Sequence, residues 1–452
     1  MGFSDGRNKG KRGARTENKD PALAALEGAE TLQQQAERKS GGAAIPGLQE
    51  AAAAYKETLR LAGDHPLPAD RHLDACFGLG ESMQRLAECI LEACSALPDS
   101  ELTAAVEADA RSNAKILFRQ SADAYKKVKA EDGKMRVDAC VNAANVLAAW
   151  ADVEEATGDL AAATQLLISS VEGYQRSLEL EEDAATWSNL ADTLVKRAEL
   201  LQEAGDAEDC ISSVYGEAMA AYAKACSLCS SEDGDDLPGL LHNWGVGLHS
   251  LGTHARNAAL ASSSLEEAAV RLRESVAFNR GDPQPHNALG DTLVARAEST
   301  SDTTETLACY NAALGEGYSA ALRLDARNSD ALVGTAEVNS ALGKLAEQTG
   351  NRGGAAQHYS EAVRAYAAAL QRPEALGGLR ERSDVRYNYA CTCAQALACG
   401  AIPPVEVAAA QQQVANTLRG LLSLGTATRE QIAGDADFAG VREQPWFAAL
   451  LQ

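Results

Sequence analysis

Cysteines and histidines are the residues of this chain best suited to chemistry. Cys226 and Cys229 form a C-x-x-C pair, a spacing that activates a thiolate when it lies at a helix N-terminus. Here the pair ends a helical pattern, where the helix dipole disfavours a thiolate, so we expect packing rather than redox function. Cys391, Cys393 and Cys399 point to different sides of one helix without a fourth ligand nearby in the sequence, so no metal site is predicted.

The histidines give no stronger signal. His242 and His249 are seven residues apart and share a helix face, but joint metal binding by one short segment needs i, i+4 spacing, so we interpret them as groove-lining residues. His72 and Cys76 have that spacing without companions. The chain also lacks a phosphate-binding loop and a Gly-x-Ser-x-Gly elbow. We therefore predict a protein that is not an enzyme and uses no cofactor.

Composition limits the fold and the compartment. The 452 residues are 46% hydrophobic but only 5% aromatic, and helix-favouring types dominate, so the fold is predicted to be all-α. No window approaches the roughly 18 apolar residues of a membrane span, and the N-terminus lacks an apolar segment suited to secretion. Cysteines without a small-domain spacing suggest a reducing compartment. These features indicate a cytoplasmic protein, with the nucleus as the alternative, and no membrane partner.

The charge is unevenly distributed. A formal net charge of −23 should repel nucleic acid and attract basic proteins or peptides, unless the acidic surface serves only solubility. Residues 1–20 are instead basic and rich in glycine and polar residues, so we predict a disordered arm. The arm could import the protein into the nucleus, contact RNA, or simply be solvated.

A helical pattern with an aromatic centre recurs along the chain. Most copies have small residues four before and three after the centre, so all three share one helix face. The central residues are Tyr55, Tyr125, Tyr174, Tyr222, Leu272, Tyr318 and Tyr366. Successive centres after the second are 46 to 50 residues apart. We predict that these tyrosines lie in the core and that replacing Tyr222 with Ala destabilises the fold.

A second helical pattern, centred on one small residue, alternates with the first. The small residues are Gly80, Ala144, Ala191, Gly245, Gly290, Ala336 and Ala390. The segments ADTLVKRAE at 191–199 and GDTLVARAE at 290–298 are nearly identical, which indicates duplication. We therefore expect alternating A helices, with the small centre, and B helices, with the aromatic centre.

Together these two patterns resemble tetratricopeptide (TPR) repeats. The resemblance implies a right-handed α-solenoid of antiparallel helix pairs, with about seven to eight units over residues 21–420. The repeat is near 48 residues instead of 34, and helical repeats such as half-a-TPR units remain an alternative. Residues 421–452 are predicted to form a C-terminal capping segment, in which residues 435–452 resemble the closing segment of such proteins. The apolar residues predicted to cover the last core are Phe438, Val441, Trp446 and Phe447.

The resemblance also implies that A helices line a concave groove. The position after each small residue is acidic in four of seven units, at Glu81, Asp192, Asp291 and Glu337. Further predicted groove residues are polar and lie at Asn142, Asn145, Asn189, His242, Asn243, Asn287 and Asn388. The asparagines could bind a partner's backbone or bond neighbouring helices of the solenoid.

The expected function is that of a protein-binding scaffold, adaptor or assembly chaperone for a basic client. The alternative is a structural subunit of a large protein or ribonucleoprotein assembly. TPR co-chaperones that grip heat-shock protein carboxylates need cations at positions that are Val141, Gly239 and Asn243 here, which argues against that activity. Reversing Asp192 and Asp291 to Lys is expected to slow client association and leave stability nearly unchanged.

Overall fold

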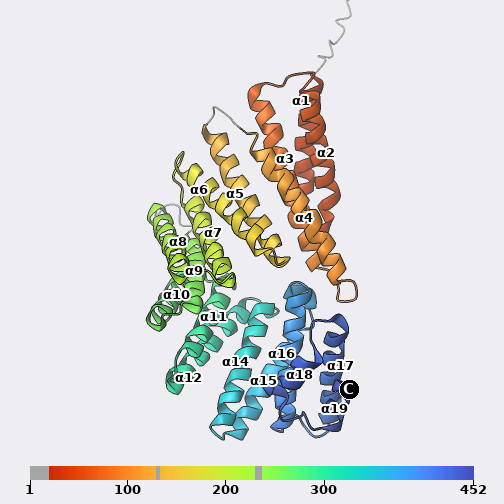
Figure 1. Ribbon diagram of the computed structural model, residues 1–452, viewed down its shortest axis with the longest axis vertical. Helices are drawn as coiled ribbons and strands as arrows, with labels where there is room; N and C mark the ends of the chain where they lie inside the picture. Colours follow the sequence, from red (N-terminus) through yellow and green to blue (C-terminus); the bar gives the residue numbers. More distant parts are fainter. Residues whose placement is uncertain (1–19, 129–132, 230–236) are drawn as a thin grey trace, which may run out of the picture.

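The computed structural model describes residues 20–128, 133–229 and 237–452, and over these ranges it contains helices and turns without a strand. Consecutive helices pack as eight pairs, numbered here in chain order (Figure 1). The A helices are α1 (Pro21–Glu37), α3 (Ala69–Ser95), α5 (Gly133–Ala156), α7 (Ala184–Glu203), α9 (Leu237–His254), α11 (Gln284–Ser299), α14 (Ser329–Gln348) and α16 (Leu379–Ala398).

Each A helix is followed by the B helix of its pair. Seven of the eight B helices are uninterrupted: α2 (Ile45–Leu61), α4 (Ala104–Tyr125), α6 (Leu160–Leu178), α8 (Glu208–Leu228), α10 (Ala258–Phe278), α15 (Arg352–Ala369) and α17 (Val407–Leu424). The B helix of pair 6 consists of α12 (Thr303–Ala312), the π-helical turn η2 (Ala313–Tyr318) and α13 (Ser319–Leu324). The prediction of an all-α solenoid with seven to eight helix pairs is confirmed.

Short polar segments separate the helices. At the end of α5, Gly158 adopts a φ of +82°, which a side chain would strain, and the next residue, Asp159, caps α6 by accepting a hydrogen bond from the Ala162 amide at 3.0 Å. Asp183 caps α7 in the same way through the Thr186 amide at 2.7 Å. These caps supply acceptors for amides that have no partner inside the helix.

The centres of the B helices form the core, as predicted. Tyr222 is only 1% exposed, and the other six centres are also buried. Tyr318 shows why the A helices need small residues. A Cβ atom added at Gly290 or Gly334 would lie 2.6 or 2.3 Å from its ring, so the ring fits only between two glycines. The small residues therefore let each A helix approach a large aromatic ring closely.

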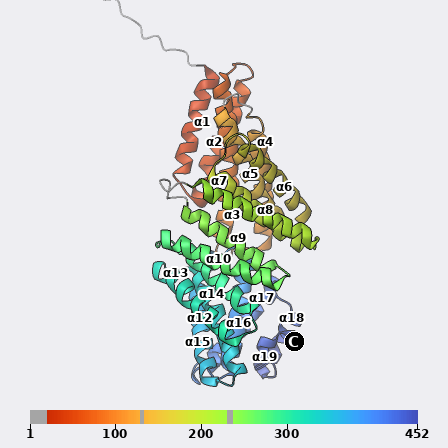
Figure 2. The same ribbon diagram turned by 90° about the vertical axis from the view of Figure 1, so that its left-hand side faces the viewer.

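The stacked helix pairs follow a curved path. Figures 1 and 2 show the pairs stacked in sequence, from α1 and α2 at one end to the C-terminal helices at the other. In Figure 1 the array bends back, so that the connection between α3 and α4 lies beside the start of α16. Pair 2 therefore touches pair 8, although five pairs separate them in the chain.

The C-terminal segment covers the last pair. It comprises α18 (Arg429–Gly434), the 3-10 turn η4 (Ala436–Phe438) and α19 (Pro445–Leu451). Phe438 and Phe447 are fully buried in a cluster with residues of α16 and α17, and Trp446 packs at the edge of this cluster. The apolar side chains that the sequence assigns to a cap therefore lie on the final core.

The sequence predicts a basic N-terminal arm and no membrane-spanning helix. The basic arm over residues 1–20 falls outside the described residues except for Asp20, which caps α1. Within the described ranges, none of the helices combines the length and the apolar composition needed to cross a bilayer.

Candidate protein-binding surface

The predicted groove residues meet in a recurring polar cluster, best formed at Asp192. The Tyr222 hydroxyl donates a short hydrogen bond to Asp192 Oδ1, and Asn243 Nδ2 donates to Asp192 Oδ2 at 3.1 Å. The three side chains belong to α7, α8 and α9, so the cluster joins one pair to the next. Asp192 is half-buried. The acidic residue therefore has a structural role in addition to any role in binding.

The same cluster occurs one unit earlier with an amide in place of the carboxylate. Tyr174 donates its hydroxyl to Asn145 Oδ1 at 2.5 Å, and Asn189 Nδ2 lies 3.4 Å from the same oxygen. Asn189 and Asn243 thus occupy matching positions and point back to the preceding A helix. For these two asparagines the structure shows bonds to neighbouring helices, one of the two alternatives left open by the sequence.

Two further acidic residues vary this arrangement. Tyr318 donates to Asp291 Oδ1 at 2.7 Å, while the position of the asparagine is Gly334, which has no side chain to donate to the second oxygen. Glu337 and Asn388 are both exposed, and the Asn388 amide stabilises the Glu337 carboxylate. At the N-terminal end, Gln33 Nε2 donates to Glu81 at 3.0 Å. We call Glu81, Asp192, Asp291 and Glu337 the acidic row.

In two units the tyrosine and the acceptor are both replaced. The unit with Leu272 in place of tyrosine has Val246 in place of an acceptor, and Val246 is 40% exposed. Pair 8 shows the same double replacement. Buried Leu418 lies in the tyrosine position, 27 residues after Cys391, which lies in the acceptor position. Comparing the units with one another could have revealed this paired change, because a buried hydroxyl requires a partner that an apolar side chain does not.

Crowding by neighbouring protein atoms raises the pKa of the row, although Asp291 and Glu337 reach the surface. Desolvation raises the pKa of Asp192 to about 6, although the bonds from Tyr222 and Asn243 oppose the change. Desolvation likewise raises the pKa of Asp291 and Glu81. The pKa of Glu337 rises through desolvation and then through repulsion by Asp291 and Glu298. The carboxylates of Asp291 and Glu337 are therefore close enough to repel each other.

The ion pairs of the described residues do not involve the acidic row. On the described surface Lys196 pairs with Glu155 at 2.7 Å, and Arg271 pairs with Glu267 and Glu274 at 3.1 Å each. Among the residues with assigned positions, no Lys or Arg forms an ion pair with a member of the acidic row. The row therefore carries negative charge that the rest of the described chain does not neutralise.

The remaining predicted groove residues are dispersed. Asn287 is buried and donates to Asn328 Oδ1 at 2.9 Å, where Asn328 caps α14. His242 is half-buried, and desolvation lowers its pKa, which favours the neutral ring. Asn142 lines a small pocket of about 290 Å³ together with Glu81 and Tyr125. These residues do not converge on one site, so the acidic row is the better candidate surface.

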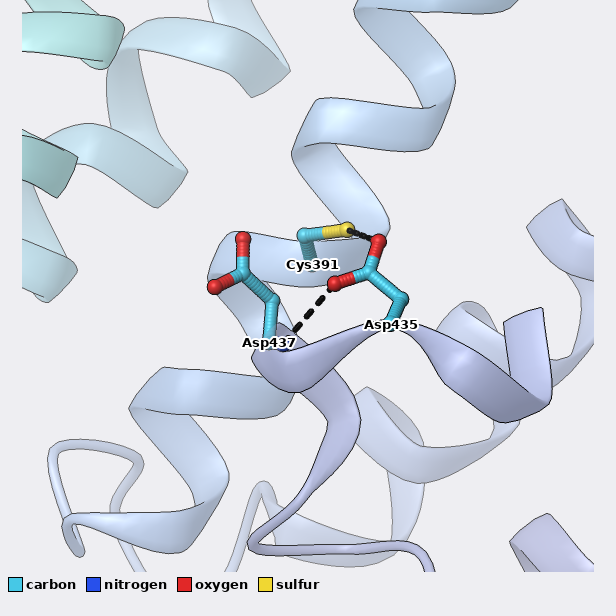
Figure 3. Close-up of side chains that lie close together, drawn as sticks. All are labelled: Cys391, Asp435 and Asp437. Atoms are coloured by element: carbon cyan, nitrogen blue, oxygen red, sulfur yellow. Dashed lines mark hydrogen bonds between the residues drawn. The ribbon is translucent and has the colours of Figure 1, made fainter. Parts of the chain in front are cut away.

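One group of side chains has the spacing of metal ligands. Ligand atoms of Cys391 in α16 and of Asp435 and Asp437 in the C-terminal segment lie within 4.8 Å of one another (Figure 3). Burial raises the pKa of Cys391 well above its usual range, and its thiol lies 3.8 Å from Asp435 Oδ2. Tyr387 donates to the same Asp435 oxygen at 2.9 Å, and Lys344 pairs with Asp437 at 2.8 Å. These bonds attach the C-terminal segment to the array.

Burial also raises the thiol pKa in the C-x-x-C pair. Desolvation first, and then the neighbouring Cys229, raise the pKa of Cys226 to about 11, so the protonated thiol dominates at neutral pH. The prediction that this pair lacks an activated thiolate agrees with that environment.

Comparisons with known proteins find similarity only at the level of structure. No family model and no curated protein matches the chain. The C-terminal part of a TPR protein from Cytophaga hutchinsonii is 9% identical with a TM-score of 0.38, covering 77% of this chain and 98% of its own. The nuclear import adaptor Nro1 from S. pombe is 12% identical with a TM-score of 0.37, covering 67% and 94%. YrrB, a TPR protein with an unusual peptide-binding site, is 16% identical with a TM-score of 0.30, covering 55% and 97%.

Identities and scores this low carry no functional argument. The repeating helix pairs and the aromatic rings seated between small residues define the architecture within the chain itself. In its fold, the chain is an all-α solenoid of helix pairs, similar in architecture to TPR repeats.

Proposed function

We propose that the protein is a scaffold without catalytic activity, which binds a basic, extended segment of another protein along the acidic row. The single observation that carries the proposal is the pair Asp291 and Glu337. Both side chains are exposed, they repel each other, and neither has a cationic partner among the described residues. A Lys or Arg side chain of a partner placed between them would relieve this repulsion.

The spacing of the row favours an extended partner. Its acidic members belong to α3, α7, α11 and α14, so successive charges lie on different helix pairs along the array. A folded domain would meet them at few points, whereas a segment that runs across several pairs can place one cation near each. The fields of such charges also add, which speeds association at low ionic strength.

The test uses a fluorescently labelled oligolysine peptide and measures anisotropy at two ionic strengths. Replacing Asp291 by Asn and Glu337 by Gln together should weaken binding about tenfold, since an exposed charge pair contributes up to about 1 kcal/mol. The matched control replaces two exposed B-helix carboxylates, Glu217 and Glu266, by Gln. Equal weakening by both double variants would mean that only net charge matters, and the proposal would be abandoned.

Binding should also depend on pH with a defined sign. Because the pKa of Asp192 is raised to about 6, and those of its fellow members are also raised, the row loses negative charge as the pH falls through this region. Oligolysine keeps its charge there. The peptide should therefore bind more weakly at pH 5 than at pH 7.5, and an unchanged affinity would contradict a role for the row.

A further inference from the structure

A buried arginine joins the two regions of the array that meet in space. Arg382, in the first turn of α16, is 0% exposed. Its Nη1 atom donates to Leu97 O at 2.8 Å and to Asp99 Oδ1 at 2.9 Å, and its Nη2 atom donates to Ser95 O at 2.5 Å. The Nε atom donates to Gly377 O at 2.9 Å. Every guanidinium nitrogen thus has an acceptor, and three of the four acceptors lie in pair 2.

Two more contacts reinforce this junction. Arg386, one turn further along α16, pairs with the second oxygen of Asp99. The Leu379 amide donates to Glu107 Oε1 at 2.7 Å, so a carboxylate of α4 caps the start of α16. Next to this bond, a Cβ atom added at Gly378 would lie 2.7 Å from Glu107 Oε1. We call the contact between Ser95–Glu107 and Gly377–Arg386 the clasp.

The clasp is not a consequence of the repeat. In a helical-repeat array each unit needs contacts only with its neighbours to bury its core. The clasp bonds instead connect residues that are 272 to 287 positions apart. Burying a guanidinium is costly unless its charge and donors are satisfied, so this contact has a built set of partners and is more than a chance touch of two surfaces.

We propose that the clasp is a latch that holds the solenoid in a closed turn, and that the free protein opens when the latch is broken. Closed, pair 2 and pair 8 are fixed together and the curvature of the array is set. Open, the contacts between adjacent pairs remain, because the latch residues are not part of the cores that join them. Opening therefore separates the two regions and widens the curve, without unfolding any helix pair.

The test compares the full chain with variants by small-angle X-ray scattering and hydrogen exchange. Arg382→Ala combined with Arg386→Ala should increase the radius of gyration and the maximum dimension, with the circular dichroism spectrum unchanged. Arg380→Ala, which removes an exposed arginine from the same helix, should leave the scattering curve as it is. A latch variant whose scattering curve superimposes on that of the wild type would overturn the proposal.

A milder variant guards against loss of folding. Glu107→Ala keeps Arg382 and its acceptors but removes the partner of the Leu379 amide. Exchange at Leu379 and over residues 95–102 should become at least about tenfold faster, whereas exchange in α7 and α8 should not change. Unchanged exchange at both sides of the clasp would show that Glu107 does not latch the turn. Both experiments use the free protein, so their outcome is independent of the proposed peptide binding.

Discussion

The polar cluster at Asp192 and the clasp at Arg382 are both charged, hydrogen-bonded junctions between helices, but they differ in origin. The cluster joins adjacent pairs, and it recurs with substitutions at Asn145, Asp291 and Glu337. The clasp joins distant pairs and occurs at one place in the described array. The cluster is repeated with the unit, whereas the clasp depends on the curvature of the whole array.

This difference separates two kinds of stability. The clusters act locally, since each supports the contact of one B-helix tyrosine with the A helices on either side. The clasp acts globally, since it constrains the sum of many small rotations between pairs. A change in a cluster should therefore weaken one region of the core, and a change in the clasp should alter the shape of the whole array.

The largest expected effect comes from removing a cluster tyrosine. Tyr222→Ala should destabilise the fold by about 3–5 kcal/mol, because it leaves a cavity between α7 and α9 and deprives Asp192 of its donor. Chemical denaturation with hydrogen exchange of α7 to α9 would measure it. Tyr222→Phe, which keeps the ring, is the control and should have a smaller effect. Equal losses would show that the hydroxyl bond, not the packing, dominates.

Breaking the clasp should be next in size but different in kind. Arg382→Ala removes the buried charge and leaves the carbonyls of Ser95 and Leu97 without donors, a local cost of about 3 kcal/mol. The loss should appear as faster exchange on both sides of the clasp. If protection fell equally in the distant helices α7 and α8, the contrast between local and global junctions would be wrong.

A smaller effect, with a pH dependence, is expected at Asp192. Its folded-state pKa of about 6 exceeds the ordinary value of 3.8, so ionisation destabilises the fold above pH 6, and this cost disappears as the pH falls below about 4. Asp192→Asn should therefore raise stability at pH 7.5 by about 1–3 kcal/mol, and the gain should shrink at pH 5. Asn145 shows that an amide can accept the same bonds. Thermal melts at both pH values measure the difference.

The smallest effect on stability is expected at Glu337. Its side chain is exposed, and Glu337→Gln should change the melting temperature little while it weakens oligolysine binding.

The structure corrects the expectation that reversing Asp192 and Asp291 to Lys leaves stability nearly unchanged. Each of these carboxylates accepts a hydrogen bond from a buried tyrosine. Glu337 is therefore the cleaner site at which to separate binding from folding. A large loss of stability there would remove that distinction.

Much of the fold could be predicted because its information is local and repeated. Small residues in A helices and aromatic centres in B helices recur near every 48 residues, and each instance confirms the others. The burial of Tyr222 and its fellow centres follows directly from that pattern. The acidic row was also visible in the sequence, because its members have the same position in four of the seven units.

The hydrogen-bond partners of the row could not be predicted with the same security. The helical period places Asn189 and Asn243 on one side of their helices, but it does not fix the exact rotation of each helix about its axis. That rotation decides whether the two side chains face a partner or a neighbouring helix. The paired exchange of Tyr for Leu272 and of an acceptor for Val246 was present in the sequence. It acquires meaning only once the two positions are known to touch.

The sequence by itself determined the helix pairs, their order and the composition of the core, because these depend on contacts within a unit and with its neighbours. Only the tertiary structure decided which distant units meet. Arg382 has the same residue type as several exposed arginines, and nothing in its local pattern predicts complete burial. Its burial results from the accumulated curvature of the pairs between α3 and α16, and a small change in the angle at each contact would carry its partners out of reach.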